Sequence, residues 1–156
     1  MKLPLLLITV LSVTSWSIAA DKLPVLTKTE ALRAITLFRE DPLSEIGRGA
    51  GGLIMNYAEK SPDVRVVVSQ KCIPFLSNKG IPINEKSTLI AAFVVGNVDS
   101  QLLRNQKKDD SYAGVLQVID SYRQIQREKP KFRLEEIEKF IELEKRGQLK
   151  AYVSSK

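Results

Sequence analysis

Helix-start signals recur along the chain, and apolar residues follow each of them at helical spacing. Thr27 and Glu30 match a capping box, in which each side chain accepts a hydrogen bond from the backbone N–H of the other residue. Further starts or periodic segments lie at Asp41-Pro42, at Ser61-Pro62-Asp63, at Asn84, at Asp109 or Asp110, and over about residues 134–146. The pattern predicts an all-α fold, either a compact bundle or a short α-solenoid-like array of about six helices.

The region around residues 61–83 is less regular than the rest. A third helix is expected to begin at Ser61-Pro62-Asp63 and to end near Pro74, because Val64, Val67, Val68 and Cys72 share one helical face. The β-branched run over residues 64–68 leaves a strand as the alternative. Residues 73–83 are rich in proline and are expected to form an ordered loop.

The most apolar segment, residues 89–98, is hydrophobic nearly all round. A helix with that pattern is typical of a protein interior, so we expect the helix over about residues 85–103 to be the central one. A membrane span is the alternative, but Lys86 and Asp99 enclose a run that is too short for one.

The helix starts at residues 41–42 and 61–65 resemble those of the helical hairpins in HEAT and armadillo repeats. This resemblance covers about a third of the chain. It implies a short α-solenoid and identifies no functional residues.

The first twenty residues have the layout of a cleaved secretory signal peptide. Lys2 supplies the positive end, residues 5–13 are apolar, and small residues precede a cleavage site at Ala19, with Ala20 as the adjacent alternative. An uncleaved anchor is the weaker reading, because the apolar run is short. We therefore expect a periplasmic or secreted protein whose residues 21–156 form a single helical domain.

Composition excludes several chemistries. The chain has no histidine, so it can form neither a Ser-His-Asp triad nor a His-ligated zinc site, and we expect neither metal nor cofactor. Cys72 is the only cysteine and cannot form an intramolecular disulfide; we expect it to be buried, with pairing between chains as the alternative. The 24 basic and 18 acidic residues are interspersed, which argues against a nucleic-acid partner.

A glycine motif stands out in residues 45–60, where Gly47, Gly49 and Gly52 have the spacing G-x-G-x-x-G. A dinucleotide-binding site would need a preceding strand and an acidic residue about twenty positions later, and neither is found. Instead, a helical stripe runs through the glycines, formed by Leu43, Ile46, Ala50, Leu53, Ile54, Tyr57 and Ala58. Gly47 and Gly51 lie on one shoulder of that stripe, where we expect close helix packing. Gly49 and Gly52 lie on the other side, where either another helix covers them or they are candidates for contact with a partner. A break in the helix at residues 47–52 is the third possibility.

The acidic residues offer few catalytic candidates. Most carboxylates lie where they would cap helices or face solvent; only Asp99 and Asp120 stand next to apolar sequence. We therefore expect an exported, non-catalytic helical module that binds an envelope or secreted partner, most simply a protein. The alternative is a small hydrolase that uses two carboxylates across a pocket.

Overall fold

The computed structural model describes residues 26–154, and this part of the chain contains six α-helices, one 3₁₀ turn and no β-strand. The helices are α1 (Lys28–Glu40), α2 (Glu45–Lys60), α3 (Ile83–Arg104), α4 (Ser111–Glu128), α5 (Glu135–Lys145) and α6 (Leu149–Ser154); the turn η1 covers Pro74–Ser77. The prediction of an all-α fold is confirmed. The predicted leader, with Ala19 and Ala20, lies outside the described residues.

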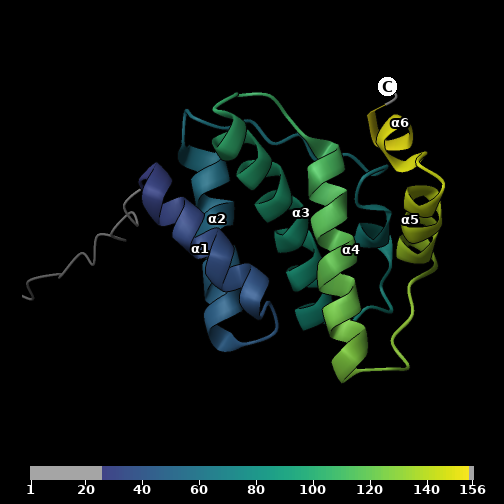
Figure 1. The fold of residues 1–156 in the computed structure, drawn as a ribbon. Helices are drawn as coiled ribbons and strands as arrows, with labels where there is room; N and C mark the ends of the chain where they lie inside the picture. Colours follow the sequence, from purple (N-terminus) through teal and green to yellow (C-terminus); the bar gives the residue numbers. More distant parts are fainter. Residues whose placement is uncertain (1–25, 155–156) are drawn as a thin grey trace, which may run out of the picture.

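The helices form a bundle around α3, as Figure 1 shows. The α1–α2 hairpin packs on one side of α3, and α4 packs along another side. Helices α5 and α6 then cover α4 on the side away from the α1–α2 hairpin (Figure 1). Residues 91–98 of α3 are buried without interruption, which confirms the prediction of a central apolar helix.

Two further glycines allow α3 and α4 to pack closely. A Cβ atom added at Gly96 would overlap the carbonyl oxygen of Ala113, and one added at Gly114 would lie 2.7 Å from the Phe93 ring. The two helices therefore meet at the bare backbone of both glycines, which leaves no room for a methyl group at either position.

The capping predictions hold at α1 and α4. Thr27 and Glu30 form the predicted capping box, and the Asp110 carboxylate accepts the Ala113 N–H at 3.1 Å at the start of α4. Gly147 has φ +68° after α5, as expected of a left-handed residue that ends a helix. The chain then forms the short α6, which places Tyr152 6.3 Å from Phe140 between ring centroids.

The second helix begins later than predicted, and the reason is a turn. The Asp41 carboxylate accepts the backbone N–H groups of Leu43 and Ser44, both at 3.1 Å, so Asp41-Pro42 forms a turn and does not cap a helix. The Ser44 hydroxyl caps α2 in its place, accepting the Gly47 N–H at 2.9 Å. Similarly, α3 begins at Ile83 and not after Asn84.

The predicted third helix is wrong: residues 64–69 are neither helix nor strand. Their backbone groups bond to side chains that come from distant parts of the chain. The Gln101 amide accepts the Arg65 N–H and donates to the Arg65 carbonyl, both at 2.9 Å, and Asp109 accepts the Val67 N–H at 2.6 Å. These bonds supply the partners that a helix or a sheet would otherwise provide.

Candidate functional site

The glycine segment forms one continuous α-helix, α2, as the periodicity predicts. Two of its glycines face the protein interior. A Cβ atom at Gly47 would overlap the carbonyl oxygen of Asp41, and one at Gly51 would lie 3.0 Å from the Phe38 ring and 3.1 Å from the Ala91 Cβ. Gly47 therefore lies against the turn between α1 and α2, and Gly51 lies where α1 and α3 approach the α2 backbone.

The other two glycines, Gly49 and Gly52, face outward. A Cβ atom added at either one would have no neighbour within 4 Å. Because they are three residues apart, they share one face of the helix. The result is a strip of bare backbone for which the fold itself has no packing use.

Exposed apolar side chains flank this strip. Ile46 and Leu53, which the sequence placed in the buried stripe, are 68% and 40% exposed, so that prediction is wrong for both. The buried face centres instead on Gly47, Ala50, Gly51, Ile54 and Tyr57, because the α1–α2 turn packs against the backbone at Gly47 and helices α1 and α3 pack against it at Gly51. Met55, 41% exposed, borders the strip on its other side, and sequence reasoning missed it. We define the outer face of α2 as Ile46, Gly49, Gly52, Leu53 and Met55.

A small apolar hollow opens beside this face. It has a volume of about 160 Å³ and is lined by Phe38, Arg48, Gly52, Met55, Ser87, Thr88 and Ala91. Gly52 belongs both to the hollow and to the bare strip, so the two form one continuous surface. The ring of Phe38 and the methyl of Ala91 come from α1 and α3, and periodicity within α2 gave no signal for either.

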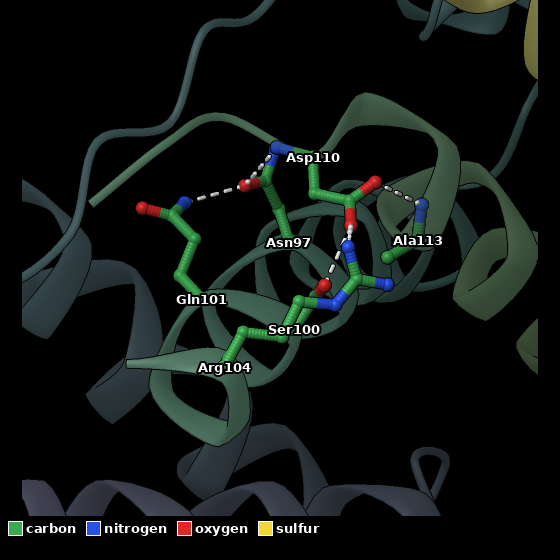
Figure 2. Close-up of polar contacts among 6 residues, drawn as sticks. All are labelled: Asn97, Ser100, Gln101, Arg104, Asp110 and Ala113. Carbon is green, nitrogen blue, oxygen red and sulfur yellow. Dashed lines mark hydrogen bonds and ion pairs between the residues drawn. The ribbon is translucent and has the colours of Figure 1, made fainter. Parts of the chain in front are cut away.

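A second, polar pocket of about 280 Å³ lies where α3 ends and α4 begins. Figure 2 shows the polar contacts at this junction, where Ser100, Gln101, Arg104 and Asp110 also line the pocket. The buried Asn97 accepts the Gln101 amide at 2.7 Å and the Asp110 N–H at 3.1 Å, and it donates to Asp109 at 2.8 Å. Asp110 in turn accepts the Ser100 hydroxyl at 2.6 Å and pairs with Arg104 at 3.3 Å. Because both aspartates bond to groups of the fold, this network joins α3 to α4.

The two candidate catalytic acids both lie in ion pairs. Asp99 lies 2.8 Å from Arg39 and Asp120 lies 3.5 Å from Arg123. Asp120 lines a hollow together with three arginines and two glutamines, and no second carboxylate lines it. A pair of carboxylates facing each other across a pocket, as the hydrolase alternative requires, is therefore not formed by Asp99 and Asp120.

Two tyrosines bond to glutamates of α5. The Tyr112 hydroxyl donates to Glu144 at 2.9 Å, and the Tyr122 hydroxyl donates to Glu138 at 2.7 Å. Burial, followed by the hydrogen bond to Glu138, raises the pKa of Tyr122 to about 12. Both hydroxyls therefore hold α4 to α5. The two glutamates bond to α4, whereas the sequence analysis placed such carboxylates at helix caps or toward solvent.

The remaining sequence candidates are structural. Cys72 is buried, and the Ser69 hydroxyl donates to its sulfur at 3.2 Å. Within residues 26–154, no group of three or more acidic or cysteine side chains could hold a metal ion. No helix in that part of the chain is long and apolar enough to cross a membrane. The sequence matches no protein-family model, and comparisons with curated proteins and with solved structures give no match either.

Proposed function

We propose that the chain is an exported, non-catalytic helical module that binds another protein of the cell envelope or secreted fraction through the outer face of α2. The observation that supports this most is the bare backbone at Gly49 and Gly52. Glycine inside a helix costs about 1 kcal/mol relative to alanine. Nothing within the fold recovers that cost at these two positions, whereas a partner that packs on the backbone would.

The partner is best described as an apolar helix. Two glycines one turn apart leave a shallow groove along α2, and small residues at a helix surface let a second helix approach closely. Ile46 and Leu53 border this groove on one side and Met55 borders it on the other. Exposed apolar side chains that gather on one helix mark an interaction surface more often than a solvated one.

The hollow beside Gly52 provides a place for an anchoring side chain. Its walls are mainly the apolar groups of Phe38, Met55 and Ala91, and its volume of about 160 Å³ suits one leucine- or methionine-sized group. Binding energy at protein interfaces concentrates where a large side chain fills such a pocket. The layout of residues 1–20, which predicts a secretory signal peptide, supports an encounter outside the cytoplasm.

Photo-crosslinking tests this proposal in the cells that make the protein. A photoreactive phenylalanine analogue replaces Leu53 in the full-length chain, and the matched control carries it at Leu103, which is exposed on α3. We expect position 53, and not position 103, to capture one partner protein through an apolar helical segment. An absence of adducts at position 53, or the same adducts at both positions, would overturn the proposal. Capture of a second copy of the chain would also contradict it, because the contact would then be self-association.

A further inference from the structure

A third hollow, of about 360 Å³, lies between the end of α1 and the adjoining face of α4. Its lining consists of Arg39, Gln117, Asp120, Arg123, Gln124 and Arg127. None of these residues belongs to the outer face of α2. The three arginines come from positions up to 88 residues apart, so the sequence alone does not bring them together.

Arg39 is held in place by two contacts of its side chain and one of its backbone. Its Nε donates to the buried Gln117 at 2.7 Å, and its Nη1 pairs with Asp99 at 2.8 Å. The Gln124 amide also donates to the Arg39 backbone carbonyl at 3.3 Å. These contacts fix the guanidinium at the wall of the hollow. Its remaining nitrogen, Nη2, forms no hydrogen bond or ion pair within residues 26–154.

The arginines of α4 are poorly neutralised. Within residues 26–154, Arg123 forms its ion pair with Asp120, at 3.5 Å, and both side chains are more than half exposed. Arg127 makes no hydrogen bond or ion pair with any described residue. Arg123 and Arg127 are four residues apart on one helix face, a spacing at which like charges repel. Three guanidinium groups therefore share a hollow that is lined by one carboxylate, Asp120, while Asp99 pairs with Arg39 from outside the lining.

We propose that this hollow binds the phosphate group of a small anionic compound or of a lipid headgroup. Guanidinium groups bind phosphate oxygens through paired N–H donors, and arginine is the residue that proteins use most for this recognition. A bound anion would relieve the repulsion between Arg123 and Arg127. The volume of the hollow falls within the range of small-molecule sites, so it has room for more than a bare ion.

Isothermal titration of the purified chain with pyrophosphate, at low and at raised ionic strength, tests the soluble source. Flotation with phosphatidylglycerol vesicles, against phosphatidylcholine vesicles, tests the lipid source. We expect saturable binding in one of these two arms, weakened by salt because the contacts are charged. The arm that responds identifies the source of the phosphate.

The variant for this test is Arg123→Gln with Arg127→Gln, and the matched control is Arg33→Gln, an exposed arginine of α1 outside the hollow. We expect the double variant to bind at least tenfold more weakly and the control to bind as the wild type does. Circular dichroism shows whether both variants remain folded. Binding in neither arm, equal weakening in the control, or unchanged binding in the double variant would overturn the proposal. None of these outcomes bears on the outer face of α2.

Discussion

Replacing Gly49 and Gly52 together by alanine adds two methyl groups to the outer face of α2 and changes nothing else. Neither methyl group would meet another atom within 4 Å. Each substitution removes the backbone freedom that glycine has in the unfolded chain and is worth about 1 kcal/mol in a helix interior. The two positions share no partner in the fold, so we expect a total gain of about 2 kcal/mol in the free energy of unfolding.

Urea and thermal denaturation followed by circular dichroism measure that gain. A change of about 1 kcal/mol shifts the Tm of a domain of this size by roughly 4 °C, so the double variant should melt about 8 °C above the wild type. The matched control is Gly147→Ala, which also meets no atom within 4 Å but has φ +68°. Alanine there should cost about 1 kcal/mol, because L-residues disfavour the left-handed region. A double variant that is less stable than the wild type would show that the α2 backbone is already covered, which would refute the reasoning.

Three other substitutions test the interior and its charges. Gly47→Ala places a methyl group against the Asp41 carbonyl and should destabilise the fold by about 3 kcal/mol in urea denaturation; wild-type stability would contradict the packing described at α2. Asn97→Ala removes three hydrogen bonds and should cost roughly 2–4 kcal/mol in the same assay, whereas a loss below about 1 kcal/mol would show that the network adds little. Burial acts to raise the pKa of Glu85, but its bonds to Lys129 and to the backbone outweigh burial and hold the pKa below its usual value. The Glu85–Lys129 pair therefore stabilises the fold above about pH 4.3 and is lost as the pH falls through the lowered pKa. Lys129→Met should cost about 1–3 kcal/mol at pH 7 and less once the pH falls below the lowered pKa of Glu85, where the carboxyl of the paired protein becomes neutral; the same deficit on both sides of that pKa would refute this assignment.

Local signals in the sequence were sufficient for several elements. The capping box at Thr27 depends on neighbours within four positions, so its chemistry is readable without the fold. The central helix was predictable because a segment that is apolar on every side has no stable place at a surface.

The errors have a common physical cause. In residues 64–69, Arg65 bonds to Gln101, which is 36 residues away, and Val67 bonds to Asp109, which is 42 residues away. Local propensity could not predict these distant partners, which satisfy backbone groups that a helix would otherwise satisfy. The buried face of α2 differs from the predicted one for a related reason. An apolar stripe predicts which side chains can be buried. Gly47 and Gly51 have no side chain, so other parts of the chain can pack closely against the backbone at these positions.

The candidate sites divide in the same way. The outward position of Gly49 and Gly52 followed from helical periodicity, since it depends on α2 alone. The hollow beside Gly52 depends on Phe38 and Ala91, and the arginine hollow depends on Arg39 meeting α4. In the sequence, the nearest sign of the arginine hollow is the pair Arg123 and Arg127, which are four residues apart and share a helix face with one acid, Asp120.

The affinity of the Gly49→Ala, Gly52→Ala variant for the partner captured through position 53 tests the central claim most directly. If the bare backbone of α2 receives a partner helix, two methyl groups must hold that helix away. We expect the dissociation constant to rise at least tenfold, equivalent to about 1.4 kcal/mol, although the variant itself is more stable than the wild type. Unchanged or tighter binding by this stabilised variant would contradict the claim that the outer face of α2 is the binding surface.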